Sequence, residues 1–258
     1  MSKSSTASKG RQGVFTPTPE AKGKATRNRV IAFCLWAGAI ALQLVAIFWV
    51  MRPSFDEQVE AQGFPEWRFY LLLGFVAVIG LLAVGGNLLW KQANRLDPAS
   101  EREPVKFFIQ NQLGAFMTLV AFLPLIIMIF LNKDMDSKQK GIAGGAAVVV
   151  AVVATVIGID FTPLSQEQAA VESQVVTQLV GEDRVWWSGG GNVMHLCQDV
   201  SDLRNVTTGI SSGTVAEAFA AGKTGITLNL TQNLSQCDLA TPANIDEIID
   251  WVRASRGR

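Results

Sequence analysis

The chain has 258 residues, of which 49% are apolar and 17% charged, a composition too apolar for an ordinary soluble domain. Its formal net charge is zero, but the charge is unevenly distributed. Residues 1–29 hold seven bases and one acid, whereas residues 165–258 hold eleven acids and six bases. Because nucleic-acid-binding domains carry an excess of basic residues, the acidic C-terminal region excludes nucleic acid as an expected partner.

The first 28 residues are rich in serine, threonine, lysine, glycine and proline, and they contain almost no apolar side chains. A segment of this composition cannot bury enough apolar surface to offset the entropy of ordering. We therefore expect residues 1–28 to form a disordered basic tail.

Four uncharged apolar runs follow the tail, and each is long enough to cross the hydrocarbon core of a bilayer as a helix, which takes about 20 residues. None of them contains a lysine or arginine, which would be costly at the bilayer centre. The sequence predicts an all-α transmembrane bundle of four helices within residues 29–160. The runs are Val30–Met51, Phe69–Trp90, Phe107–Leu131 and Gly141–Ile159.

The basic residues between the runs predict the orientation of the bundle, because lysine and arginine concentrate in cytoplasmic loops. With the N-terminus in the cytoplasm, the tail and the loop 91–106 together contribute eleven bases to the inside. The two loops on the other side contribute five. Four crossings return the chain to its starting side. The sequence thus predicts an integral plasma-membrane protein whose N-terminus and C-terminal domain both face the cytoplasm.

Several residues in the runs bear on helix packing. Pro124 is expected to kink the third helix. Gly141 and Gly145 form a small-xxx-small pair that would let another helix approach closely, either from the same chain or from another subunit. A transporter would need ionisable groups at mid-depth, and the only candidate, Asp160, lies at the end of the last run. The polar amides are expected to form hydrogen bonds between helices: Gln43, Asn87 and residues 110–112.

The chain beyond the membrane is predicted to form a linker helix over residues 161–181 and a small α+β domain over residues 182–258. Ser165 and Thr214 are each followed three residues later by a glutamine or glutamate, which is typical of a helix N-terminus. The run ITLNL, residues 226–230, alternates as a strand does. Thr241 is expected to cap a last helix whose first residue is Pro242. Two glycines are placed to end helices: Gly181 and Gly222.

The stretch VWWSGGGNVMHLCQDVSDL, residues 185–203, is the strongest candidate for chemistry. It reads as a β-hairpin whose glycine triplet supplies a turn with positive φ. His195 and Cys197 face the same side of one strand, and Cys237 could join them as weak candidate metal ligands. A structural zinc site requires four ligands, so no metal site is assigned. A catalytic Cys–His pair needs an orienting third group, and we assign no catalytic or cofactor-binding residue.

Cys197 and Cys237 could also form a disulfide that closes a loop of about 40 residues. Disulfides persist in oxidising compartments, whereas the basic residues predict a cytoplasmic domain. The cysteines and the predicted orientation therefore point in opposite directions, and both possibilities stay open at this stage.

Two runs in the middle of the chain, NRLDPASEREPVKFF and NKDMDSKQKGIAGG, resemble a group of actinobacterial membrane proteins with four predicted helices and a small C-terminal domain. With a weaker similarity in the C-terminal domain, the resemblance covers roughly residues 68–240. In that domain the cysteines depart from the group's pattern, because Cys197 lies early and a terminal CxxC is reduced to Cys237. The matching positions are Val185–Trp187, His195–Leu196, Gly213–Val215 and Gly222–Lys223.

Some small actinobacterial membrane proteins of this kind are accessory subunits of the respiratory supercomplex that joins cytochrome bc to cytochrome c oxidase. The resemblance implies a non-enzymatic accessory subunit in the electron transport chain, without a cofactor or redox centre of its own. Its partners would be the lipid bilayer and other membrane subunits, which it would contact through protein–protein interactions. The alternative from another class is a membrane-anchored sensor of a small ligand or metal, with the C-terminal domain as receiver. A membrane enzyme ranks third.

Overall fold

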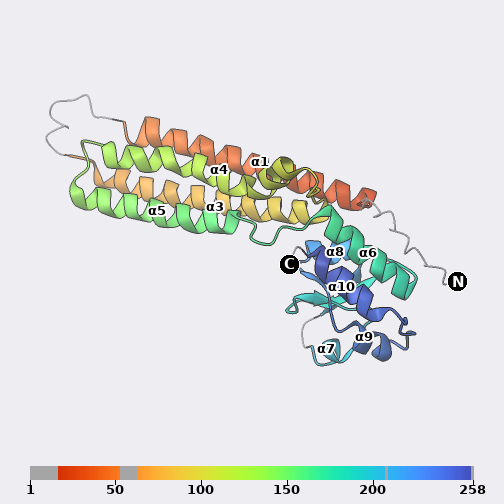
Figure 1. Cartoon of the computed structure of the whole chain (residues 1–258). Helices are drawn as coiled ribbons and strands as arrows, with labels where there is room; N and C mark the ends of the chain where they lie inside the picture. The colour runs from red at the N-terminus through yellow and green to blue at the C-terminus, as the bar shows by residue number, and fades with distance from the viewer. Residues whose placement is uncertain (1–16, 53–62, 207–208, 257–258) are drawn as a thin grey trace. The chain divides into compact units, whose positions relative to one another are not determined.

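A computed structural model describes residues 17–52, 63–206 and 209–256 (Figure 1). The described residues divide into two compact units. The bundle unit comprises residues 23–94 and 104–163, apart from 53–62. The C-terminal unit comprises residues 17–22, 95–103 and 164–256, apart from 207–208. The predicted class, a helical bundle with a small α+β domain, is confirmed.

The bundle unit contains the four predicted membrane helices, each long and apolar enough to cross a bilayer. This confirms the prediction of an integral membrane protein. The first helix ends in one π-helical segment, and the third runs without interruption through Pro124. The elements are α1 (Pro19–Val45), η1 (Ala46–Val50), α3 (Glu66–Leu96), α4 (Pro104–Leu131) and α5 (Ser137–Gly158).

Helix α1 begins earlier than predicted. We expected residues 1–28 to be disordered, and this is wrong for residues 19–28, which form the first turns of α1. Ala21, Ala25 and Ala32 recur at helical spacing and are all buried, so residues 19–28 have a packed face in spite of their three bases. The first turn is capped by Thr18, whose hydroxyl accepts a hydrogen bond from the Ala21 amide at 3.2 Å. Residues 1–16 lie outside the described residues.

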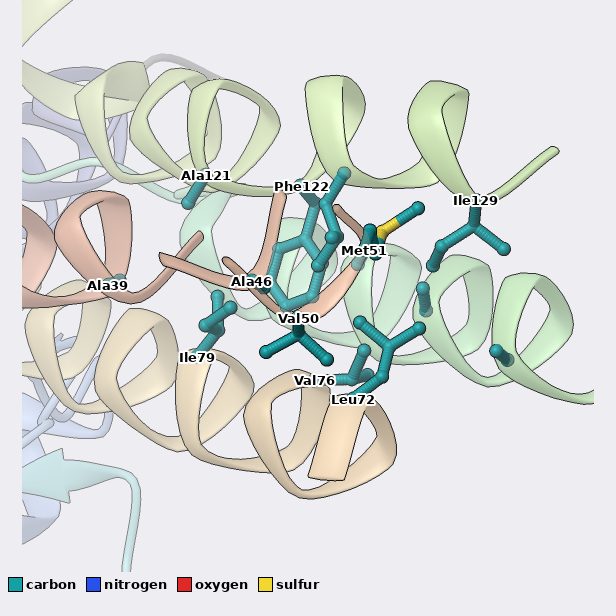
Figure 2. Packing of buried hydrophobic residues seen from close by; sticks show 14 of the residues in the cluster. Ala39, Ala46, Val50, Met51, Leu72, Val76, Ile79, Ala121, Phe122 and Ile129 are labelled. Atoms are coloured by element: carbon teal, nitrogen blue, oxygen red, sulfur yellow. The ribbon is translucent and has the colours of Figure 1, made fainter. Parts of the chain in front are cut away.

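The core of the bundle is filled by apolar side chains from all four helices. Figure 2 shows those of α1, η1, α3 and α4 turned toward one another around the ring of Phe122. The outward faces are also apolar: Leu81 is 74% exposed and Phe48 is 73% exposed. A bundle that is apolar inside and outside fits a lipid environment, where the outer face needs no polar cover.

One buried amide joins the four helices. The Asn87 side chain of α3 accepts a hydrogen bond from the indole N–H of Trp36 in α1 at 3.1 Å. Its Nδ2 donates to the Thr118 hydroxyl of α4 and to the Ala154 carbonyl of α5, each at 2.9 Å. Both Asn87 and Thr118 are fully buried. The prediction that Asn87 serves helix-to-helix hydrogen bonding is thus confirmed, and its contacts reach all three neighbouring helices.

Small residues around Asn87 leave room for this contact. A Cβ added at Gly114 would lie 2.9 Å from the Asn87 Oδ1. A Cβ added at Gly158 would lie 2.7 Å from the Ala115 nitrogen and 2.9 Å from the Asn87 Nδ2. Both distances are shorter than van der Waals contact, so only glycine allows α4 and α5 to approach each other this closely.

The C-terminal unit mixes short strands with helices. Strand β1 (Val185–Ser188) pairs antiparallel with β3 (Ile210–Gly213), and β2 (Val193–Met194) pairs parallel with β4 (Gly225–Ile226). A single antiparallel bridge, Trp186 to His195, links the two pairs. The helices are α6 (Gln166–Val180), α7 (Ser201–Arg204), α8 (Val215–Ala220), α9 (Leu230–Gln236) and α10 (Ile245–Ser255).

The capping predictions hold at four helix ends and fail at one. The Ser165 hydroxyl accepts from the Gln168 amide, Thr214 forms a reciprocal capping box with Glu217, and Gly181 ends α6 with φ of 95°. The predicted cap at Thr241 is wrong, because α10 begins at Ile245 after Asn244. Gly222 follows α8 with φ of 91°, as predicted.

Two other boundaries differ from the sequence prediction. Helix α6, predicted as a linker, contributes Val171, Val175 and Val176 to the core of the C-terminal unit. The predicted strand 226–230 is wrong beyond Ile226, because Leu230 already begins α9. Leu230 is fully buried, so one turn of helix can bury it as well as a strand would.

The loop between α3 and α4 belongs to the C-terminal unit. The Gln166 amide donates to the Ala99 carbonyl at 3.0 Å, and the Ser100 hydroxyl donates to the Glu167 carboxylate at 2.5 Å. The Glu101 amide donates to the other oxygen of the same carboxylate at 3.0 Å. These bonds fix the loop to the first turn of α6, within the run that carries the resemblance described above.

The close approach of α4 and α5 can be tested by adding one methyl group. We expect Gly158→Ala to destabilise the bundle by about 1–3 kcal/mol, since the new Cβ overlaps backbone atoms of α4. The matched control is Gly145→Ala in the same helix, where a Cβ meets no atom within 4 Å. Unfolding of both variants in mixed detergent micelles measures the difference; equal stabilities would contradict the packing described here.

Candidate functional site

The stretch of residues 185–203 is held in place by main-chain pairing. The Trp186 amide donates to the His195 carbonyl at 2.9 Å, and the His195 amide donates back at 2.8 Å. The predicted hairpin is therefore reduced to one bridge between Trp186 and His195. All four residues of β1 pair with β3 instead. The glycine triplet was expected to supply a positive φ, but neither Gly190 nor Gly191 has one. A Cβ at Gly191 would instead lie 2.8 Å from the Ser188 Oγ, so close approach is what the turn requires.

Lys223 binds the main-chain carbonyl groups on both ends of the glycine turn. Its side chain is buried, and its Nζ donates to the Ser188 carbonyl at 2.7 Å and to the Gly191 carbonyl. Burial lowers the pKa of the Lys223 ammonium below its ordinary value. The Gly222–Lys223 pair of the resemblance thus has a structural role here: Gly222 turns the chain after α8, and Lys223 holds the turn between β1 and β2.

Cys197 and Cys237 are joined by a disulfide, with their sulfurs 2.05 Å apart and their Cα atoms 5.8 Å apart. The bond connects the segment after β2 with the end of α9. Hydrogen bonds accompany it on both sides: the Leu196 amide donates to Asn233 at 3.2 Å, and the Ser201 amide donates to Gln236 at 3.0 Å. Because both thiols are used in the bond, neither is free to bind a metal ion.

His195 precedes Cys197 by two residues and is buried, with 3% of its surface exposed. Its Nδ1 has no hydrogen-bond partner among the described residues. Burial lowers the pKa of the imidazole, although the carboxylate of Asp202 and a side-chain hydrogen bond with Asn233 act in the opposite direction. The described residues contain no group of three or more His, Cys, Asp or Glu side chains placed to hold a metal.

An ion pair between buried Glu172 and half-buried Arg256 forms the polar centre of the C-terminal unit. The fully buried Glu172 carboxylate accepts from Arg256 at 3.0 Å and from the Ile226 amide at 2.7 Å. Arg256 also donates to the Ile226 carbonyl at 2.6 Å. Burial raises the pKa of Glu172, while Arg256 and the Ile226 amide act against this shift. The pair joins α6, β4 and the C-terminal end of the chain.

Sequence reasoning missed Glu172, Arg256 and Lys223, because each acts on a partner 30 or more residues away. A glutamate at the centre of the apolar face of α6 was the one available signal. The helix face that carries Val171 and Val175 is buried, and a charged residue there requires a partner of opposite charge.

The predicted packing pair on α5 faces away from the bundle. A Cβ added at Gly141 or Gly145 meets no atom within 4 Å. The residues of α5 that pack inside the bundle form a different row: Ala143, Ala147, Ala151, Ala154 and Gly158. Among the described residues, no helix of the same chain packs against this pair, and its glycines lie on an outward face.

No known protein family, curated protein or solved structure matches the chain.

The buried imidazole predicts a dependence of stability on pH. A histidine whose pKa is lowered on folding contributes stability that is present above its unfolded pKa of about 6.5 and is lost as the pH falls through the folded pKa. We expect His195 to contribute a loss of unfolding free energy between pH 7.5 and 5.5, limited to about 1.4 kcal/mol per pH unit for one proton.

The measurement compares the native chain with His195→Gln, which removes the titrating group. Other acids, such as Glu172, titrate equally in both proteins and cancel in the difference. The native chain should lose more stability on acidification than the variant. Parallel pH profiles would show that His195 is not buried in its neutral form.

Proposed function

We propose that the chain is a non-enzymatic accessory subunit of a membrane assembly, and that a helix of a partner subunit packs on the outward face of α5. The observation that carries this proposal is the position of Gly141 and Gly145 on that face, with open space around both. In lipid, apolar surface alone does not drive helices together, and small residues allow the close backbone contact that does.

The neighbouring residues of this face suit such a contact. Val149 is 62% exposed and Val152 is 56% exposed, and both have branched side chains with few rotamers to lose on binding. Together with the glycines they form a shallow, smooth strip. We refer to this strip as the α5 outer face: Gly141, Gly145, Val148, Val149, Val152 and Val156.

The assembly we propose is the respiratory supercomplex of cytochrome bc and cytochrome c oxidase in the plasma membrane. Support for it comes from the resemblance of residues 94–145 to actinobacterial proteins of that kind. We place the N-terminus and the C-terminal unit in the cytoplasm, because eleven bases then lie inside and five outside. The loop 95–103 is bound to α6 in the C-terminal unit, which agrees with a common side for both segments.

The alternative function, a membrane-anchored sensor of a small ligand or metal, has less support. For a metal it would need a set of converging ligands, and the described residues contain no group of three or more His, Cys, Asp or Glu side chains placed to hold one.

The proposal is tested by native gel electrophoresis of membranes solubilised in mild detergent. We expect the native chain to migrate with the cytochromes of the bc and oxidase complexes. Replacing both glycines of the outer face (Gly141→Leu and Gly145→Leu) should abolish this co-migration while the bundle stays folded. The matched control is Gly74→Leu on α3, another position where a Cβ meets no atom within 4 Å.

Co-migration of the double variant at the native level would contradict a role for the α5 outer face. A native chain that migrates alone would contradict the accessory function as a whole. Zinc binding by the purified full chain, together with migration alone, would favour the sensor.

A further inference from the structure

The disulfide joins two segments that are 40 residues apart in sequence. Cys197 lies three residues after the end of β2, and Cys237 directly follows α9. The fold therefore brings the two sulfurs into bonding position by the packing of β2 and α9. Cys34, which lies in α1, is the other cysteine of the chain and is not bonded.

The bond is within reach of solvent. Both cysteines are half-buried; Leu196 and Leu234 in the same segments are buried, at 1% and 0% exposed, whereas Gln198 and Asp238, which directly follow the cysteines, are exposed. The cross-link thus lies at the edge of the core of the C-terminal unit. Exchange with an external thiol requires attack on one sulfur along the S–S axis, and an enclosed disulfide would not permit it.

The surrounding contacts are able to hold the segments together without the bond. The Leu196 amide remains bonded to Asn233, and Ser201 and Gln236 are linked by both backbone and side-chain hydrogen bonds. Opening the disulfide would leave the two thiols as neighbours. Re-formation would then need no rearrangement of the fold.

The redox conditions of the compartment determine whether such a disulfide is permanent or reversible. The charge distribution places the C-terminal unit in the cytoplasm, where disulfides are rare and those present are usually transient or redox-sensing. We propose that Cys197 and Cys237 form a reversible redox-modification site that exchanges with low-molecular-weight thiols of the cytoplasm. This inference rests on the cytoplasmic placement proposed above, but not on the identity of the partner assembly.

The exchange is balanced in two steps. The thiolate of a low-molecular-weight thiol, RSH, attacks one protein sulfur and forms a mixed disulfide, while the other sulfur leaves and takes up a proton. A second RSH then attacks the mixed disulfide, which releases the second protein thiol and RSSR. Two cysteine thiols replace one disulfide, and the small thiol is oxidised. The reverse reaction with RSSR restores the bond.

Reduction should loosen the C-terminal unit. Opening a loop of 40 residues is expected to raise the equilibrium constant for unfolding roughly 100- to 1,000-fold in the chain-entropy model. The effect should be largest at α9 and the segment that follows it, because this is the part that Cys237 ties to β2.

The test uses the full chain in growing cells, in a Cys34→Ser background so that only the pair reports. Thiols are trapped with acid, and the precipitated protein is dissolved in denaturant and labelled with a polyethylene-glycol maleimide that shifts it on a gel. We expect both thiols to be labelled in untreated cells, no labelling after a brief treatment with the thiol oxidant diamide, and restored labelling once the oxidant is removed.

A second arm determines the side of the membrane. After reduction of intact cells with an impermeant phosphine, an impermeant maleimide should label neither cysteine. Labelling in this arm would place the disulfide outside and overturn the inference, whatever the result of co-migration with the cytochromes. A pair that stays oxidised in untreated cells and resists a permeant thiol would also overturn it. Amide exchange at α9 in the purified chain, with and without reductant, measures the loosening without any variant.

Discussion

The buried side chain of Asn87 is the interaction on which the bundle depends. Helices in a bilayer gain little from apolar contact with each other, because lipid offers the same contact. A polar group in the bundle core is different, since leaving it unpaired in a medium without water is costly. Asn87 uses its amide oxygen on α1 and its amide nitrogen on α4 and α5. All three contacts are available in one arrangement of the helices, which specifies their order and depth.

The C-terminal unit uses the same principle with charged groups. Buried Glu172 and half-buried Arg256 bind the backbone of β4, so that a helix, a strand and the segment after α10 must meet before either charge is paired. Such a pair adds little net stability in comparison with apolar packing. It does penalise any arrangement in which one partner is missing. Gly225 leaves the space for this contact, because an added Cβ there would lie 2.6 Å from the Arg256 Cζ and the Glu172 Oε1.

Local features of the fold could be predicted from the sequence, and distant contacts could not. The membrane helices were predictable because 19–25 uncharged residues leave few alternatives, and the caps at Ser165 and Thr214 depend only on neighbours three residues away. The start of α1 was missed because alanines at helical spacing are hidden among charged residues. Helix α9 was missed because LTQNLSQ has no strong period, and its burial depends on Leu230 and Leu234 meeting a core built elsewhere.

The predictions for the candidate site differ from the structure more than the predictions for the fold do. His195 and Cys197 suggested chemistry because they are two residues apart, but the fold pairs the cysteine with Cys237 and buries the histidine against α9. The glycines suggested a turn with positive φ, whereas Gly191 is needed to leave space for the Ser188 hydroxyl. On α5, the spacing of Gly141 and Gly145 predicted a packing surface, and only the positions of the other helices show that this pair lies on the outward side.

The dependence of the bundle on Asn87 is tested most directly by double-mutant cycles. Asn87→Leu is combined with Trp36→Phe, which removes the indole donor, and separately with Thr118→Val, which removes the hydroxyl but keeps the shape. Unfolding free energies of the full chain in mixed micelles give the coupling. We expect a coupling of about 0.5–2 kcal/mol in each cycle. Effects that add within about 0.3 kcal/mol in both cycles would show that Asn87 does not hold the helices together.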